Sequence, residues 1–197
     1  MQRGSPAQPP RRNGMRLSLA GSLALIGILL ATAPLMAQVT PLPSVDLARY
    51  VGRWYEIAKY PNRFQKGCVG NTSAEYALRP DGRVTVTNRC RQADGSVQTA
   101  VGIARWRETP PKDATLKVRF APSWLSFIPQ VWGDYWILAL PSDYRYVVVG
   151  EPSRTYLWIL SRTATMTEDD YRDAVAAAEA NGYHGGKLVR SPQGSVP

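Results

Sequence analysis

The feature that most constrains the fold is a tryptophan and an arginine that stand at the two ends of a series of short alternating segments. Trp54 lies in Gly52-Arg53-Trp54, and Arg162 follows Leu157-Trp158-Ile159-Leu160-Ser161. An arginine stacks well on the face of an indole ring. If the first and last strands of a sheet are neighbours, the sheet is closed into a barrel. The pair, together with Gly52, therefore predicts a small barrel that Arg162 seals at one end.

Eight segments between these ends have the residue types and bounding turns of β-strands. In the fifth, Leu116, Val118 and Phe120 alternate with Lys117 and Arg119, so one face is apolar and the other is charged. Short strands at regular spacing favour an antiparallel barrel or sandwich. The expected strands are Trp54–Tyr60, Thr72–Leu78, Val84–Asn88, Val97–Trp106, Leu116–Phe120, Tyr135–Leu140, Tyr144–Gly150 and Thr155–Ser161.

One helix is expected after the strands. Thr167 is a good N-cap, three acidic residues follow it in the first turn, and Asn181-Gly182 ends the helix. The apolar stripe consists of Tyr171, Ala174, Val175 and Ala178. A last short strand, Lys187–Arg190, is expected to pair with the barrel. This order predicts an all-β fold: an eight-stranded antiparallel up-and-down β-barrel with one C-terminal helix packed on its outside.

The N-terminal part of the chain has the pattern of a secretory signal peptide. Arg16 precedes the apolar stretch Leu17–Leu30, and small residues follow up to Ala37, after which we expect cleavage. An uncleaved membrane anchor is the alternative, but the segment is barely long enough for one and is broken by Gly27, Thr32 and Pro34.

Cleavage there divides the chain into a leader, residues 1–37, and a single domain, residues 38–197. The leader holds four arginines and no acidic residue, so the domain carries a net charge of +5 rather than +9. Its Lys and Arg residues form no run, which gives no support for a nucleic-acid partner. We expect an exported protein, periplasmic or secreted.

Cys68 and Cys90 are the two cysteines of the chain. An even pair behind a signal peptide suggests a disulfide in an oxidising compartment. The two residues flank a hairpin with Arg79-Pro80-Asp81-Gly82 as its turn. Counting outward from that turn brings them close together at the far end, with one bulge. Such a crosslink stabilises by about 3 kcal/mol in the chain-entropy model. Two free buried thiols are the alternative.

Four motifs follow one another along the chain: Val51-Gly52-Arg53-Trp54-Tyr55-Glu56-Ile57-Ala58, Ala74-Glu75-Tyr76, Gly133-Asp134-Tyr135-Trp136 and Tyr156-Leu157-Trp158-Ile159-Leu160-Ser161-Arg162. In this order and spacing they resemble the lipocalin family, and within it the bacterial lipocalins of the Blc and apolipoprotein D type. The resemblance covers about residues 45–189. It implies a barrel whose cavity binds a fatty acid, a lysophospholipid or a similar lipid. Bacterial relatives that are outer-membrane lipoproteins carry a cysteine at the cleavage site, and residues 33–38 of this chain contain none.

Strand alternation assigns side chains to the barrel interior. The ligand-binding residues expected in this way are Ala74, Tyr76, Val86, Asn88, Val118, Phe120, Tyr156 and Trp158. They form a mainly apolar wall, as a site for a small hydrophobic ligand requires. Eight-stranded barrels can also be filled by their own side chains. The residues by themselves are compatible with either a cavity or a filled core, and the family resemblance favours the cavity.

The segment between residues 122 and 132 carries Trp124, Phe127 and Trp132. In an up-and-down barrel it borders the mouth, at the end opposite Trp54 and Arg162. As a lid or wedge it would touch a membrane surface while lipid is transferred. As a plug its side chains would fold down into the barrel. The sequence supports both interpretations.

Catalytic motifs are missing from the sequence. It has no Gly-x-Ser-x-Gly elbow, P-loop or dinucleotide fingerprint. His184 is the single histidine, so with two paired cysteines we expect no metal site. Asn88 is the one polar residue assigned to the interior. We therefore expect a lipid-binding or lipid-carrying protein of the bacterial cell envelope that is not an enzyme and needs no cofactor. The alternatives are an interaction module that uses the Trp-rich mouth loop and a lipid-modifying enzyme on the same barrel.

Overall fold

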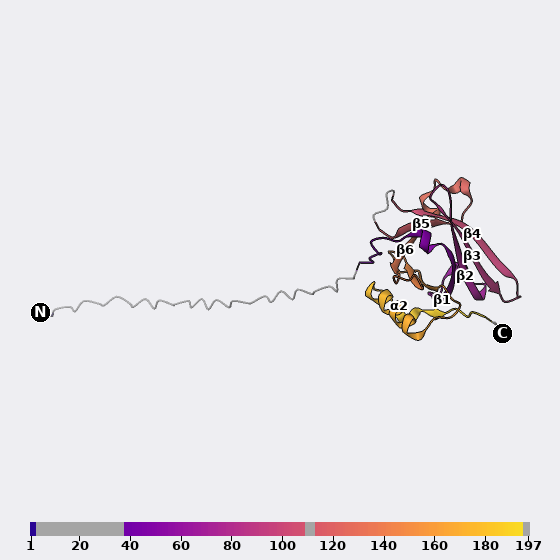
Figure 1. The fold of residues 1–197 in the computed structure, drawn as a ribbon. Coiled ribbons are helices and arrows are strands. Elements are labelled where there is room, and N and C mark those ends of the chain that lie inside the picture. The colour runs from indigo at the N-terminus through magenta and orange to yellow at the C-terminus, as the bar shows by residue number, and fades with distance from the viewer. Residues whose placement is uncertain (3–37, 109–112, 195–197) are drawn as a thin grey trace. The chain divides into compact units, whose positions relative to one another are not determined.

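A computed structural model describes residues 1–2, 38–108 and 113–194 of the chain. In this part, eight antiparallel strands enclose a barrel and one long helix lies outside it (Figure 1). The expected leader and its cleavage site lie outside the described residues. The strands are β1 (Gly52–Lys59), β2 (Cys68–Leu78), β3 (Val84–Gln92), β4 (Val97–Trp106), β5 (Thr115–Arg119), β6 (Gly133–Ala139), β7 (Tyr146–Gly150), β8 (Leu157–Ser161) and the short β9 (Val189–Arg190). The helices are α1 (Leu47–Tyr50), α2 (Glu168–Ala180) and the 3-10 turns η1 (Arg63–Gln65), η2 (Ser123–Leu125), η3 (Pro129–Val131) and η4 (Gly185–Lys187).

The topology is the up-and-down barrel that the sequence predicts. Each strand from β2 to β8 pairs with the next, and β1 closes the sheet by pairing with both β8 and β2. Tyr55 of β1 lies opposite Ser161 on one side and Ser73 on the other. The last strand, β9, pairs with β1 as expected.

Several expected strand ends differ from those in the structure, and four of them have a local reason. The β2–β3 hairpin continues past its expected limits because the Cys68–Cys90 disulfide joins its far end. β7 starts at Tyr146 since Tyr144 has a left-handed backbone, with φ of 60°. Tyr156 lies before β8, in a turn where the Glu151 carboxylate accepts hydrogen bonds from backbone amides, including that of Tyr156 at 3.1 Å.

The disulfide between Cys68 and Cys90 is present, with the two Cα atoms 5.6 Å apart. Both cysteines of the chain are therefore used, and the free-thiol alternative is wrong. The bond joins β2 and β3 at the mouth end of the barrel, where the β2–β3 register is irregular.

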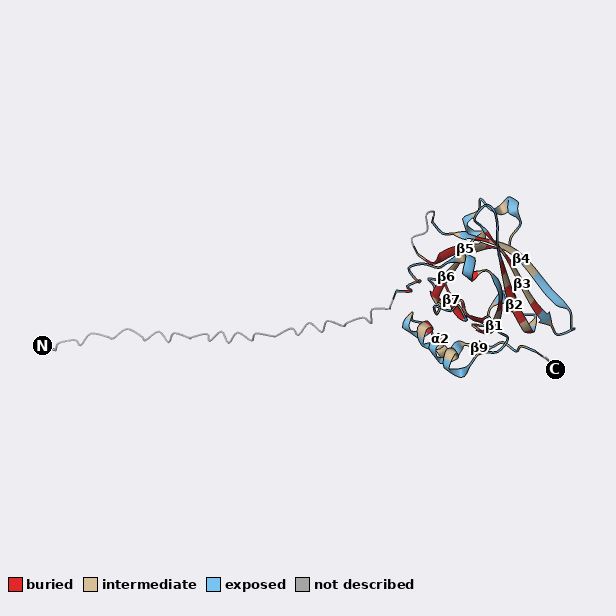
Figure 2. Ribbon diagram, in the orientation of Figure 1, coloured by how far each residue is buried: buried red, intermediate tan, exposed pale blue. Residues whose placement is uncertain are grey.

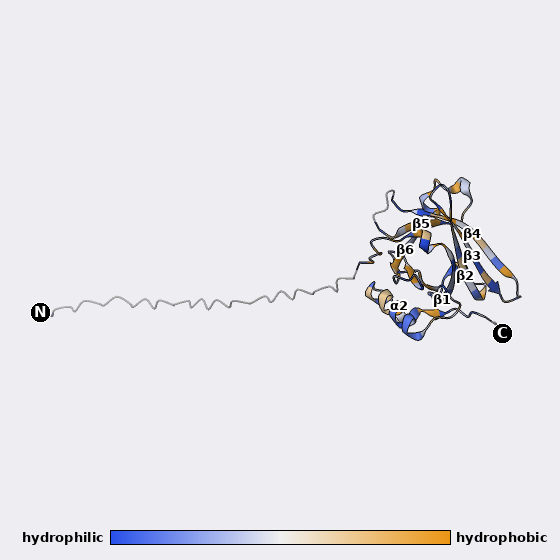
Figure 3. Cartoon of the chain, in the orientation of Figure 1, coloured by the Kyte–Doolittle hydropathy of each residue, from blue (hydrophilic) through white to orange (hydrophobic). Residues whose placement is uncertain are grey.

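Buried side chains form two clusters, one on each side of the barrel wall. On β7, Val147 and Val149 point into the barrel, while Tyr146 and Val148 pack outward toward α2. The helix contributes Ala174 and Ala178, whose small side chains allow it to lie close to the wall. The outer face of β4 has no such cover, and its exposed side is visible in Figure 2. Hydrophobic and hydrophilic residues are interspersed along β2 to β4, as Figure 3 shows.

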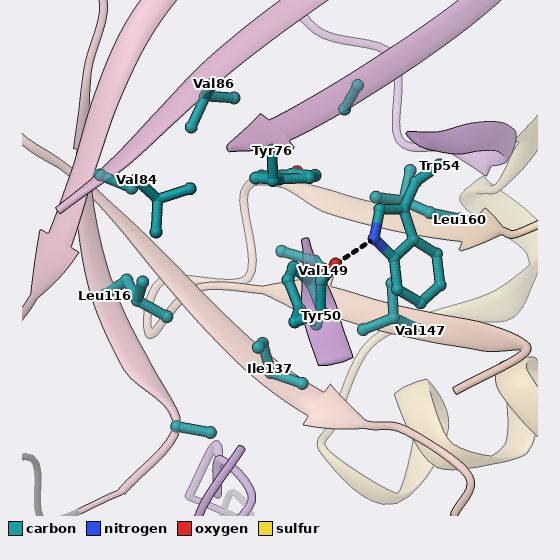
Figure 4. Close-up of a cluster of buried hydrophobic side chains, with 13 residues drawn as sticks. Tyr50, Trp54, Tyr76, Val84, Val86, Leu116, Ile137, Val147, Val149 and Leu160 are labelled. Atoms are coloured by element: carbon teal, nitrogen blue, oxygen red, sulfur yellow. Dashed lines mark hydrogen bonds between the residues drawn. The ribbon is translucent and has the colours of Figure 1, made fainter. Parts of the chain in front are cut away.

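The closed end is built around Trp54, which is fully buried. Its indole nitrogen donates to the Tyr50 carbonyl at 2.9 Å, the contact drawn in Figure 4. The guanidinium of Arg162 lies over the indole ring, 3.8 Å from its centroid. Gly52 has φ of 97°, and a Cβ atom there would lie 3.3 Å from Nη1 of Arg162. A glycine at this position therefore provides both the backbone conformation and the room for the arginine.

Arg162 also hydrogen-bonds to backbone carbonyl groups at and just after the end of α1. It donates to the backbone oxygens of Arg49, Tyr50, Val51 and Arg53, at 2.6, 3.1, 3.0 and 3.2 Å. These oxygens follow a helix of one turn, and a helix end leaves carbonyls without intrahelical partners. The arginine thus ties the floor of the barrel to the last strand.

Replacement of Arg162 by methionine is expected to lower the free energy of unfolding by about 3 kcal/mol, because it removes the cation–π contact and several charge-assisted hydrogen bonds. Urea unfolding followed by tryptophan fluorescence measures the change. The matched control is Arg172→Met, at an exposed position on α2, where we expect a change of about 0.5 kcal/mol or less. Equal effects of the two substitutions would contradict the sealing role of Arg162.

Candidate ligand-binding site

Three tyrosines meet in the interior of the barrel. The hydroxyl of Tyr135 hydrogen-bonds to those of Tyr50 at 2.6 Å and Tyr76 at 2.9 Å. Burial raises the pKa of Tyr76 to about 12 and raises the pKa values of the other two as well. All three hydroxyls therefore stay neutral and satisfy one another, which lets polar atoms lie in an apolar interior.

Side chains nearly fill the base of the barrel around these tyrosines. A cavity of about 10 Å³ remains there, which is room for about one water molecule. Its lining is apolar and aromatic: Leu47, Tyr50, Val51, Tyr76, Val84, Val86, Ala104, Leu116, Val118 and Tyr135. The lower half of the interior thus resembles a filled core, which is one of the two alternatives that the sequence allowed.

Most of the lining residues expected from alternation are part of the interior cluster. Ala74, Tyr76 and Val86 are buried in it, and Val118 and Trp158 pack against it. Asn88 lies opposite Ala74 of β2 on one side and Ala100 of β4 on the other, so small side chains flank it on both sides. Its Oδ1 atom is buried and has no hydrogen-bond partner in the described structure.

The two remaining lining residues lie beyond the ends of their strands. The ring of Phe120 covers Gly102, where a Cβ atom would come within 2.7 Å of the ring, and the side chain stays 43% exposed. Tyr156 stacks on Trp158 with ring centroids 5.8 Å apart. Phe64, from η1, also contacts Tyr156, with ring centroids 5.5 Å apart. Aromatic rings therefore border the mouth on two sides.

A β-bulge places Lys59 beside Glu56 in the upper interior. The register between β1 and β8 shifts between Glu56 and Ala58. As a result Glu56 lies opposite Leu160 and Lys59 opposite Trp158, and residues directly opposite share a face of the sheet. Lys59 Nζ lies 3.1 Å from Glu56 Oε1, with both side chains largely buried.

Gln65 connects this ion pair to the aromatic border. Its side-chain amide donates to Glu56 Oε2 at 2.6 Å and accepts from the indole nitrogen of Trp158 at 3.2 Å. The expectation that Asn88 is the one polar interior residue is therefore wrong. Alternation from Trp54 turns Glu56 inward, but alternation fails for Lys59, which follows the bulge, and Gln65 comes from a turn that has no strand periodicity to read. Asn62, which caps η1 and also bonds Gln65, is the local sequence signal that places this turn.

The mouth loop, residues 122–132, does not plug the barrel. Trp124 and Phe127 are 70% and 78% exposed. Trp132 lies against the outer wall, with its ring 4.5 Å from the Arg105 guanidinium and 5.2 Å from that of Arg119. Its indole nitrogen donates to Ser126, which folds the loop back on itself. The plug interpretation is wrong for these side chains, and Trp132 holds the loop rather than bordering the interior.

Two classes of feature are missing from the described residues. No group of three or more His, Cys, Asp or Glu side chains is placed to hold a metal ion. No helix in this part of the chain is long and apolar enough to cross a membrane.

Comparison with known proteins identifies the family. A profile for the lipocalin-like domain matches residues 45–193. The chain belongs to the lipocalin family. It is 44% identical over 154 residues to temperature-induced lipocalin-1 of Arabidopsis thaliana, covering 78% of this chain and 82% of the relative. It is 37% identical over 152 residues to the outer membrane lipoprotein Blc of Escherichia coli K12, covering 77% and 81%.

Solved structures agree with this lipocalin fold. The cockroach allergen Per a 4 superposes with a TM-score of 0.60 at 18% identity, covering 79% of this chain and 92% of that one. Insecticyanin from the tobacco hornworm Manduca sexta gives 0.60 at 21% identity, covering 79% and 85%. At these identities the likeness concerns the fold alone.

The buried tyrosines set an alkaline limit on stability. The pKa of Tyr76 rises from 10.0 to about 12 in the folded state, and those of Tyr50 and Tyr135 rise too. A raised folded pKa means that the native state keeps a proton that the unfolded state has lost. Stability is therefore full below pH 10 and falls as the pH approaches 12. Each tyrosine adds a slope of about 1.4 kcal/mol per pH unit.

Urea unfolding at increasing pH measures this slope. Tyr76→Phe should make the slope shallower by the contribution of one tyrosine. Thr85→Ala, a control substitution on the neighbouring strand β3, should leave the slope unchanged. An identical slope in Tyr76→Phe would contradict the assignment.

Proposed function

We propose that this lipocalin binds a small hydrophobic ligand with one long acyl chain, such as a fatty acid or a lysophospholipid, and carries or stores it in the bacterial cell envelope. The observation that supports this most directly is the axial division of the interior. Its base is apolar, whereas Glu56, Lys59, Gln65 and Asn88 bring hydrogen-bonding groups to the upper half. An amphiphile with its chain downward and its polar head near the mouth matches that division.

The proposed position of the acyl chain is the middle of the barrel. The lower cavity has room for about one water, so a chain must displace side chains to enter. Small residues line the wall at Ala74, Ala100 and Gly102. Phe120 lies over Gly102 and remains partly exposed, so its ring is the side chain that can swing away most easily.

Export and envelope location are part of the proposal. The leader pattern of residues 1–37 and a disulfide in the folded domain both suit an oxidising compartment. A relative is named as an outer membrane lipoprotein, whereas this chain has no cysteine near the expected cleavage site. We therefore propose a single exported domain, residues 38–197, without a lipid anchor.

Trp158→Glu is expected to weaken the binding of a fluorescent fatty acid by at least about tenfold, because it removes an aromatic ring from the interior and places a second carboxylate opposite Lys59, where it competes with Glu56. Fluorescence titration with cis-parinaric acid measures the dissociation constant, and circular dichroism checks the fold. Phe127→Glu is the matched control on the exposed loop and should bind normally. Unchanged affinity in Trp158→Glu would place the ligand elsewhere. No binding by the unaltered protein would reject a carrier function.

We also propose that the mouth loop makes transient contact with a membrane surface during transfer. Trp124 and Phe127 project from the rim, and aromatic side chains suit the lipid headgroup region. Arg105 and Arg119 lie over Trp132 on the adjoining wall, which places positive charge at the end of the loop.

The double variant Trp124→Ser, Phe127→Ser should slow ligand transfer to anionic vesicles about tenfold while leaving the dissociation constant unchanged, since it removes the apolar tips and not the lining. Stopped-flow transfer of the fluorescent fatty acid measures the rate. Val101→Ser, an exposed valine on the outer wall of β4, is the control. Normal transfer together with loss of a bound protein partner would favour the interaction-module alternative for this loop.

Catalysis has less support than binding. Lipocalins are typically binding proteins rather than enzymes, and the chain matches their domain over most of its length. The interior carboxylate of Glu56 is already bonded to Lys59, Gln65 and Ser191. A lipid-modifying enzyme would need a group there that is free to exchange a proton with substrate.

A further inference from the structure

The ladder that closes the barrel is incomplete at the mouth end. β1 and β2 pair between Gly52–Tyr55 and Ser73–Tyr76, in the half near the floor. Beyond Tyr55, β1 continues along β8 and β9, and β2 continues along β3. The two strands therefore separate, and each would present unpaired backbone groups to the opening between them.

The segment that follows β9, Ser191–Gly194, fills this opening. On one side the Ser191 amide donates to the Ile57 carbonyl at 2.9 Å. On the other, the Asn71 amide donates to the Pro192 carbonyl at 2.8 Å. We call residues 191–194 the strap, because this short piece is bonded to both strands.

Two side chains complete the attachment of the strap. The amide of Gln193 donates to the carbonyls of Glu56 in β1 and Thr72 in β2, each at 2.8 Å. The side chain of Asn71 accepts from the Gly194 amide at 2.8 Å and donates to the Gly194 carbonyl at 3.0 Å. Asn71 has a left-handed backbone, with φ of 50°, which turns β2 toward the strap.

The strap also reaches the polar groups of the upper interior. The Ser191 hydroxyl donates to Glu56 Oε1 at 2.5 Å, while Gln65 donates to the other oxygen of the same carboxylate. Gln65 in turn accepts from Trp158. The opening that the strap covers is thus adjacent to the groups proposed to hold the ligand's polar head.

Polar contacts rather than buried apolar surface hold the strap. Val189, which leads into it, is 52% exposed, and no strap residue is fully buried. A segment with few buried apolar contacts opens at a low free-energy cost compared with the core. Its release would split the wall between β1 and β2 without disturbing the interior cluster.

We propose that the strap is a side gate of the barrel: its release opens the seam between β1 and β2 and admits or frees a single-chain amphiphile. This rests on the proposed ligand-binding function. The gate widens the mouth at the level of Glu56 and Gln65, so the polar head can leave sideways while the acyl chain slides along the interior.

The test uses the double variant Gln193→Ala, Asn71→Gly. It removes the side-chain hydrogen bonds that Gln193 and Asn71 make at the strap, leaves that of Ser191 in place, keeps a residue that tolerates the positive φ at position 71, and changes no residue proposed to contact ligand. Stopped-flow measurement with cis-parinaric acid should show association and dissociation both about tenfold faster. The dissociation constant should change by about twofold or less, because a gate lowers the barrier in both directions. Gln130→Ala, an exposed glutamine in the mouth loop, is the control.

Unchanged rates in the double variant would overturn the gate and leave the carrier function intact. A faster dissociation alone, with weaker binding, would also overturn it, because the strap would then be a ligand contact. Native-state hydrogen exchange tests the gate without ligand. The amides of Ser191 and Asn71 should exchange about tenfold faster in the variant, with those of β3 and β4 unchanged. If the unaltered protein binds no amphiphile, the carrier proposal fails, and unchanged exchange at these two amides then overturns the gate separately.

Discussion

The fold depends on the way that a single strand, β1, closes the sheet. β1 pairs with β8 along one edge and with β2 along the other, and the stacked Arg162–Trp54 pair lies where these pairings meet the floor. Because Arg162 bonds four carbonyls around α1, the segment that precedes the barrel is fixed to the strand that ends it. The apolar interior can be shielded from water at this end since no strand edge is left open there.

At the opposite end, the mouth, the same strand β1 leaves the sheet open between β1 and β2. The bulge after Glu56 turns two consecutive apolar residues, Ile57 and Ala58, toward the outer cluster and leaves Glu56 and Lys59 facing inward. β1 then departs from β2, and the strap supplies the missing hydrogen bonds. The bulge thus lies next to both the polar upper interior and the seam that the strap closes.

The outer wall is covered unequally. α2 lies on β6 and β7, and β7 is buried on both faces, while the outer face of β4 is exposed. The mouth loop is held at the edge of that bare wall by Trp132 between two arginines, and its other aromatic rings face outward. Rigid covering on one side and exposed aromatic groups on the other suit a carrier that meets a surface with its mouth.

Local pattern in the sequence determined the elements whose neighbours lie in a regular register: the eight strands, α2 with its Thr167 cap, the disulfide and the inward sides of β2, β3 and β5. The positive φ of Tyr144 and the turn held by Glu151 moved strand ends that periodicity alone placed wrongly. Tertiary structure alone decided that Glu56, Lys59 and Gln65 meet inside, that Trp132 packs outside, and that the strap joins β1 to β2. Each of these results depends on a bulge, a loop or a contact between distant segments. Such contacts are set by how the closed barrel satisfies its buried polar groups, which no repeating pattern of residues records.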